Sequence, residues 1–256
     1  MGFFYFDESI RDHGGFIVGA FIYSEEELTP LVLGAITRVG LQPKVDEFKS
    51  SSQMTKSPQQ LQLRSALADL LRAHCRVGVL VLPRSERESL GREALRCLGM
   101  LIKRNGLLET RHMAFFDEGI AFCDSQPSEL LQSCEVVLNQ DSRVCAGIQI
   151  ADYAAHCLGS MLLEEIGLLQ KTIKNDSFNG YEEGIEIELG FELWASLRYS
   201  FFMEPPPVEE SPGRNYVRAM TGVVTGRGLH IAETCDPDLR QAAVQRFGTT
   251  YLGCIY

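Results

Sequence analysis

The sequence contains no apolar run of the roughly 18 residues that a membrane-spanning helix needs. Its longest apolar run, Gly15 to Tyr23, has the length of a strand. The N-terminus also lacks the pattern of a secretory signal, because Asp7, Glu8 and Arg11 follow its first apolar residues. We therefore expect a cytoplasmic protein without a membrane partner.

Basic residues are scarce, with 24 Lys and Arg against 34 Asp and Glu and a net charge of −10. This balance disfavours a protein that coats nucleic acid through a basic surface regardless of sequence. It does not exclude a nuclease, because a metal-dependent phosphoesterase concentrates carboxylates at its centre and needs only a local basic rim.

Several enzyme signatures are also missing. The eight cysteines never show the two-residue separation of a zinc knuckle, so we expect them to be reduced and mostly buried. The sequence has no phosphate-binding loop ending in Lys-Ser or Lys-Thr, no dinucleotide fingerprint, no paired histidines of a zinc protease and no Gly-x-Ser-x-Gly elbow. Ser9 occupies the position where a haloacid-dehalogenase phosphatase has its second Asp.

The 256 residues, 45% of them hydrophobic and 23% charged, suit one large globular domain or a domain with an appendix. Apolar runs alternate with amphipathic segments, which predicts an α/β fold with a mixed sheet flanked by helices. Strands are expected at Phe3–Asp7, Gly15–Tyr23, Arg76–Pro83 and His112–Asp117, the first two antiparallel. Helices are expected from an N-cap at Ser24 to Gly40, from Ser57 to Leu71, and over Ser85–Arg104, Ser128–Leu138 and Gly147–Glu165.

An acidic, proline-rich connector over residues 204–213 marks the one boundary that the sequence suggests. It separates a main domain, residues 1–203, from an appendix of residues 214–256. The appendix is expected to form a strand at Leu229–Ala232, a helix at Asp238–Phe247 and a strand from Thr249 to Tyr256. A unit this small is not stable alone, so we expect it to pack on the main domain or on a partner subunit.

Carboxylates follow two of the predicted strands. Asp7 is followed by Glu8, and Asp117 by Glu118, each pair coming directly after an apolar run. The ends of strands in an open α/β sheet line the crevice in which ligands bind. Singly, such an acid is more simply explained as a turn cap or a salt-bridged residue.

A third carboxylate, Asp152, lies in the most apolar predicted helix, with Gln149 on the same face three residues earlier. Burying a carboxylate there is costly unless it is paired or bound to a metal. Two acids at strand ends and one in a helix together suit Mg²⁺ or Mn²⁺, which prefer oxygen ligands and relieve the repulsion between carboxylates.

Three segments, in this order, resemble a known family. Tyr5–Ser9, Phe115–Asp117 and Gly147–Ala154 are similar to the uncharacterised family catalogued as domain of unknown function 3800. The resemblance spans about residues 3 to 160 and implies a ribonuclease H-like fold with an acidic, metal-binding centre. It also implies that Glu47 joins the acids, although Phe48 and the residues after it replace the commoner His-containing version of that motif.

We therefore predict a ribonuclease H-like domain in which Asp7, Glu47, Asp117 and Asp152 bind one or two Mg²⁺ or Mn²⁺ ions and hydrolyse phosphodiester bonds of DNA or RNA. Gln149 is expected to orient Asp152 or a metal-bound water, and Lys49 or Lys56 to contact a substrate phosphate. The other expected supporting residues are Glu8, Ser9 and Glu118. A basic helix face can guide the nucleic-acid strand, although a solvated helix face is the simpler explanation; it comprises Arg84, Arg87, Arg92, Arg96, Lys103 and Arg104.

Two alternatives stay open. The fold can be a noncatalytic interaction module in which the acids pair with arginines. An ATP-handling, actin-like enzyme is the third hypothesis, but the glycine loops that such enzymes need after their first strand are missing. The sequence does not distinguish DNA from RNA as the substrate, and it leaves a homodimer open.

Overall fold

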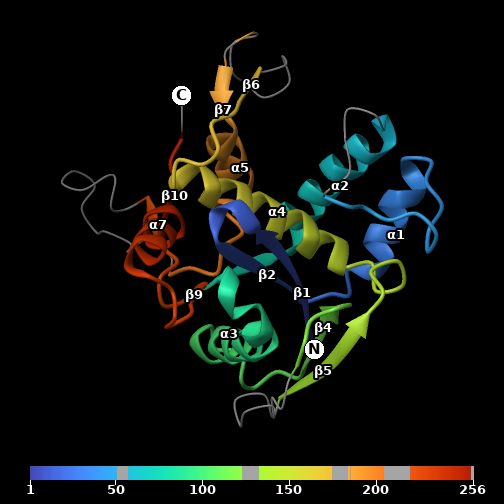
Figure 1. The fold of residues 1–256 in the computed structure, drawn as a ribbon. Helices are drawn as coiled ribbons and strands as arrows, with labels where there is room; N and C mark the ends of the chain where they lie inside the picture. The colour runs from blue at the N-terminus through green and yellow to red at the C-terminus, as the bar shows by residue number, and fades with distance from the viewer. Residues whose placement is uncertain (51–56, 123–132, 175–183, 185, 205–219, 255–256) are drawn as a thin grey trace, which may run out of the picture.

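The computed structural model describes residues 1–50, 57–122, 133–174, 184, 186–204 and 220–254 of the chain. Its main sheet has six strands in the order β5-β4-β1-β2-β3-β9 (Figure 1). Strands β1 (Gly2–Arg11), β2 (Phe16–Ser24) and β3 (Arg76–Pro83) form an antiparallel meander. On the other side of β1, strands β4 (His112–Asp117) and β5 (Cys134–Gln140) run parallel to it.

Helices cover both faces of this sheet. Helix α4 (Ile148–Glu165) crosses one face over β1 and β2 (Figure 1), where Gly147 lies directly against the ring of Tyr5. Helix α3 (Leu90–Arg104) packs on the opposite face, where Leu101 lies against Gly78 of β3. The predicted fold class, a mixed α/β sheet flanked by helices, is confirmed.

The remaining helices surround α4. Helix α1 (Thr29–Arg38) packs on α2 (Pro58–His74), and α2 packs in turn on α4. The predicted start of α2 is confirmed, because the side chain of Ser57 accepts a hydrogen bond from the backbone of Gln60. Helix α5 (Leu189–Leu197) also packs on α4, beside a hairpin of β6 (Thr172–Lys174) and β7 (Glu186–Glu188).

A cluster of aromatic rings holds β1 against its neighbours under α3. Phe6 lies 4.5 Å from Phe21 of β2 and 5.3 Å from Phe116 of β4, measured between ring centroids. All three side chains are fully buried, and each contributes roughly 1.5–3 kcal/mol of burial free energy. Because side chains alternate along a strand, packing Phe6 and Phe116 into this face turns Asp7 and Asp117 toward the face that α4 covers.

The C-terminal segment adds a strand to the main sheet. Strand β9 (Leu229–Ile231) pairs in parallel with β3, and α7 (Pro237–Phe247) packs on α4. Strand β8 (Thr221–Val223) pairs with β10 (Thr249–Tyr251) in a separate small sheet. Residues 205–219, which hold most of the predicted connector, lie outside the described residues.

Three predicted helices need correction. Ser24 ends β2 and does not cap a helix, because α1 begins only at Thr29, with Pro30 in its first turn. The described part of the predicted helix Ser128–Leu138 is strand β5, where β-branched Val136 and Val137 pair with β4. The helix predicted from Ser85 is broken into a 3-10 segment, η3 (Arg84–Ser89), followed by α3.

Within the described part of the chain, none of the helices combines the length and the apolar character needed to cross a membrane.

Candidate functional site

Asp7 and Asp117 lie on adjacent strands at one place in the sheet. Strands β1 and β4 are parallel and pair Phe6 with Phe116, so the two acids that follow are neighbours on the face under α4. Asp117 ends β4, as predicted. The prediction that β1 ends at Asp7 is wrong, because β1 continues to Arg11 and Asp7 lies within it. Both carboxylates are half-buried.

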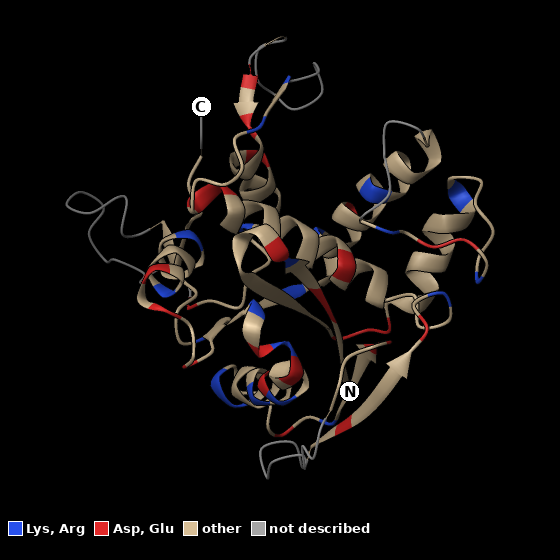
Figure 2. Cartoon of the chain, in the orientation of Figure 1, with Lys and Arg blue, Asp and Glu red and all other residues tan. Residues whose placement is uncertain are grey.

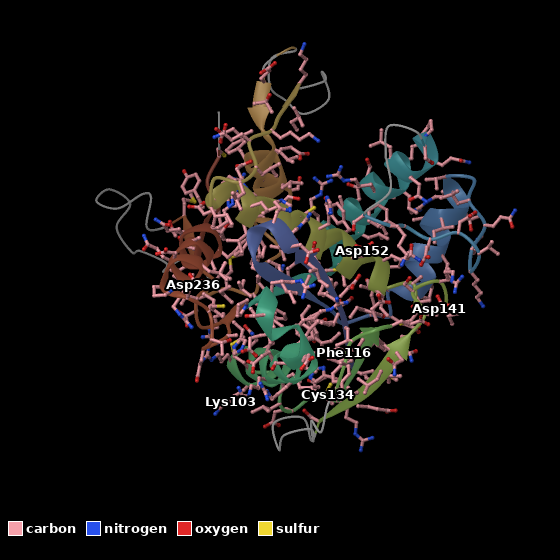
Figure 3. The ribbon with its side chains drawn as sticks, viewed as in Figure 1. Lys103, Phe116, Cys134, Asp141, Asp152 and Asp236 are labelled. Atoms are coloured by element: carbon pink, nitrogen blue, oxygen red, sulfur yellow. The ribbon has the colours of Figure 1, made fainter. Side chains whose placement is uncertain are left out.

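Asp152 comes from α4, the helix that covers this face of the sheet (Figure 3), and its charge acts on Asp7. It lies in the second turn of α4 and is also half-buried. Its carboxylate accepts two hydrogen bonds from Ser50, one from the backbone nitrogen at 3.0 Å and one from Oγ at 2.5 Å. Asp152 is therefore held in place by a residue 102 positions earlier in the chain.

The charges of these acids act on one another. Burial raises the pKa of Asp7 well above its usual value, and the charges of Asp152 and Asp117 raise it further. Burial is also the main cause that raises the pKa of Asp117 and of Asp152. The structure thus brings the three predicted acids into one electrostatically coupled cluster, in which ionising all of them is unfavourable.

Glu8, the next residue on β1, faces the opposite side of the sheet from Asp7, and its charge still raises the pKa of Asp7. The pKa of Glu8 is raised to about 7, mainly by burial. The charge of Asp117 also raises this pKa, and the charge of Arg87 in η3 lowers it. The backbone nitrogen of Glu8 donates a 2.7 Å hydrogen bond to Oδ1 of Asp7. Glu118, in contrast, is exposed in the turn that follows β4.

Glu47 and Lys49 reach the site from the loop between α1 and α2. Oε2 of Glu47 accepts a 2.6 Å hydrogen bond from Oγ of Ser142 and lies 3.3 Å from Nζ of Lys49. Burial alone would lower the pKa of Lys49, but the carboxylates of Glu47, Asp117 and Asp152 raise it. Lys49 therefore places a stable positive charge beside the acids.

The buried side chain of Gln149 ties this loop to α4. Oε1 of Gln149 accepts a 2.8 Å hydrogen bond from the backbone nitrogen of Phe48, and Nε2 donates one of 2.8 Å to the backbone oxygen of Ser142. The ring of Phe48 packs edge-on against Tyr153 of α4. Both polar atoms of this amide thus bind backbone groups of the loops that carry Phe48 and Ser142. That Gln149 orients Asp152 or a metal-bound water stays a prediction.

Replacing Gln149 by Leu should lower the free energy of unfolding by roughly 2–4 kcal/mol. The substitution leaves the buried nitrogen of Phe48 and the oxygen of Ser142 without partners, and each unpaired group costs about 1–3 kcal/mol. Urea denaturation measures the change, with Gln62→Leu on the exposed face of α2 as the matched control. Equal stability of the two variants would contradict the structural role assigned to Gln149.

Two further predicted residues, Ser9 and Lys56, have weaker or undescribed connections to the site. Ser9 lies two positions after Asp7 on the same face of β1, and no hydrogen bond of its side chain is found within the described chain. Lys56 lies outside the described residues. Ser50 and Ser142, which fix Asp152 and Glu47, are not among the predicted site residues. Their only sequence signal is a hydroxyl near each acidic motif, which is too common to identify a contact.

The predicted basic face lies along η3 and α3 (Figure 2). Much of its charge is paired, because Arg92 and Arg96 both contact Glu93 and Arg84 contacts Asp12. Arg87 differs, since its charge acts on Glu8 of the acidic cluster.

The donor atoms of the cluster are carboxylate oxygens, which suit Mg²⁺ or Mn²⁺. As the side chains are placed, however, no group of three or more Asp, Glu, His or Cys residues in the described parts of the chain is arranged to hold a metal ion. The acids therefore share one region and one electrostatic environment without forming a finished coordination sphere.

No known family and no curated protein matches the sequence. Among solved structures, a chain in the PCNA:RNase HII complex from Archaeoglobus fulgidus is similar, with 17% sequence identity and a TM-score of 0.36. The match covers 64% of this chain and 77% of that chain. A similarity this low carries no conclusion about the fold or the activity of this chain.

Proposed function

We propose that the chain is a divalent-metal-dependent nuclease that hydrolyses phosphodiester bonds of DNA or RNA. The observation that supports this function is the convergence of Asp7, Asp117 and Asp152, from two strands and the helix above them, on one region of mutual repulsion. A cation relieves such repulsion, whereas a site without a ligand leaves it as a cost to stability.

Asp7, Asp117 and Asp152 would hold Mg²⁺ or Mn²⁺, with Glu47 as a further ligand. Such an ion lowers the pKa of a bound water and stabilises the negative charge that develops on the leaving oxygen. The chain itself positions the ligands, because Ser50 fixes Asp152 and Ser142 fixes Glu47. Ion binding has to draw the carboxylates closer together than they lie here.

Lys49 would bind a substrate phosphate at the edge of the acidic cluster. About half of its side chain is exposed, so its ammonium group can exchange Glu47 for a phosphate oxygen. The negative charges around it keep it protonated at neutral pH. Arg87, whose charge acts on Glu8, supplies a second positive charge that a nucleic-acid strand can meet.

Mn²⁺ at one hundred times its dissociation constant should raise the free energy of unfolding by roughly 2.7 kcal/mol, because it binds the native arrangement of acids and not the unfolded chain. In EDTA, Asp117→Asn should melt at or above the temperature of the wild type, since one source of repulsion is gone, and Mn²⁺ should shift it less. Thermal unfolding with EDTA, Mn²⁺ and Ca²⁺ measures these shifts. A variant much less stable than wild type in EDTA would assign Asp117 a structural role instead.

A noncatalytic scaffold is the second candidate function. It is favoured by the existing partners of two of the acids, because Ser50 binds Asp152 while Ser142 and Lys49 bind Glu47. A scaffold would neither cleave nucleic acid nor gain stability from Mn²⁺, so the same titration separates the two functions.

A further inference from the structure

Arg11, the last residue of β1, lies beneath α4 on the same face as Asp7. Its Nη2 donates hydrogen bonds to the backbone oxygen of His156 at 2.8 Å and to Oγ of Ser160 at 3.3 Å. The absence of a side chain at Gly159 allows this approach, because a Cβ there would lie 2.6 Å from Nε of Arg11. The helix is thus shaped to accept a guanidinium group one turn beyond Asp152.

This guanidinium group lacks an acidic partner. Arg11 forms no ion pair within the described residues, and its Nε is buried without a hydrogen-bond partner there. A buried cation without a counter-charge is costly. Burial accordingly lowers the pKa of Arg11. An anion bound beside this group would supply the missing charge.

Further positive charges surround the same place. Arg64 of α2 extends over the ring of Tyr153, with its Cζ 5.9 Å from the ring centroid. Burial, together with the charges of Arg11, Arg64 and Lys171, lowers the pKa of His156 to about 4. Glu192 of α5 is an acidic group whose charge interacts with that of Arg64. Among the described residues, no carboxylate contributes to the lowered pKa of His156.

His156 is therefore a neutral hydrogen-bond donor at neutral pH. Nη2 of Arg11 lies 3.3 Å from its Nδ1, and because a guanidinium group can only donate, Nδ1 has to accept. The ring proton is then on Nε2, for which no partner is found among the described residues. This nitrogen offers an N–H to a ligand without adding a titrating charge.

We propose that Arg11, Arg64 and His156 form a binding site for a phosphate group. If the proposed nuclease function holds, on which this assignment rests, the group is a phosphate of the substrate strand beside the acidic cluster. His156 follows Asp152 by one helical turn, about 5.4 Å along α4. A nucleic-acid strand advances about 3.4 Å per nucleotide, so the bound phosphate lies one or two nucleotides from the cleaved bond.

Binding of a labelled single-stranded oligonucleotide in Ca²⁺ tests the site, measured by fluorescence anisotropy over a range of salt concentrations. Arg64→Gln should raise the dissociation constant about tenfold and reduce the salt dependence by about one phosphate contact. His156→Gln is the second variant, since neither change removes the buried Arg11. Arg72→Gln is the matched control, because it lies on the same helix and pairs with the exposed Asp69. The control should change affinity less than twofold.

Inorganic phosphate is the second probe, followed through the imidazole NMR signals of His156. Shifts with both phosphate and oligonucleotide support a general phosphate site, and shifts with the oligonucleotide alone support a strand-specific one. If oligonucleotide binding depends on Arg64 but the protein cleaves no nucleic acid, the phosphate site stands and the proposed nuclease function is rejected. If the wild type cleaves nucleic acid and Arg64→Gln cleaves as fast as Arg72→Gln, the phosphate site is overturned and the nuclease function stays. Failure of both probes to bind would also overturn the phosphate site.

Discussion

Asp152→Asn should reduce metal-dependent cleavage of nucleic acid at least a hundredfold, which corresponds to about 2.7 kcal/mol of activation free energy. The amide keeps the shape of the side chain and can still accept the hydrogen bond from the backbone nitrogen of Ser50, so the fold should remain. It removes the negative charge through which the carboxylate binds an ion. Initial rates on labelled single- and double-stranded DNA and RNA, with Mn²⁺ and with EDTA, measure the effect.

The matched control for this experiment is Asp69→Asn, which makes the same chemical change at an exposed acid on α2. It should cleave at the rate of the wild type. Equal residual cleavage by Asp152→Asn and the wild type would mean that the activity belongs to a contaminating nuclease or to another site. Loss of activity together with a large drop in melting temperature would instead assign Asp152 to the fold.

The central strands and the long helix could be predicted because each is encoded locally. The boundaries predicted for β3 and β4 from their apolar runs are correct, and the predicted start of α4 differs from the observed start by one residue. The neighbouring positions of Asp7 and Asp117 follow from parallel pairing of two apolar strands, each of which carries an acid. Predicting this part of the site requires only the two-residue alternation of side chains along a strand and the geometry of a parallel sheet.

The loop that carries Glu47 could not be predicted in the same way. Its position depends on contacts with residues about one hundred positions later, from Phe48 to Gln149 and from Ser50 to Asp152. Hydroxyl and amide groups form such contacts in many contexts, so the residues alone do not reveal the partner. The strand at β5 was missed for a related reason, since its pairing with β4 overrides a helical pattern in the segment.

Metal-free protein should be less stable at pH 8 than at pH 5, and Glu8→Gln should remove the part of the difference that is due to Glu8. The pKa of Glu8 rises from 4.5 to about 7 in the folded state, mainly through burial. The folded protein therefore binds this proton more tightly than the unfolded chain, and the resulting stability is present below pH 4.5 and lost as the pH rises through 7. The shifts of Asp7, Asp117 and Asp152 have the same sign.

The size of the shift in Glu8 corresponds to at most about 3 kcal/mol at pH 8, where the wild type has to bury a charge that Glu8→Gln lacks. Near pH 4 both side chains are neutral, so the two proteins should unfold with similar free energies. Urea denaturation in EDTA from pH 4 to 8 measures the divergence, with the exposed Glu109→Gln as a control that should follow the wild type throughout. A constant difference between Glu8→Gln and the wild type at every pH would show that the substitution acts through packing and not through the charge of Glu8.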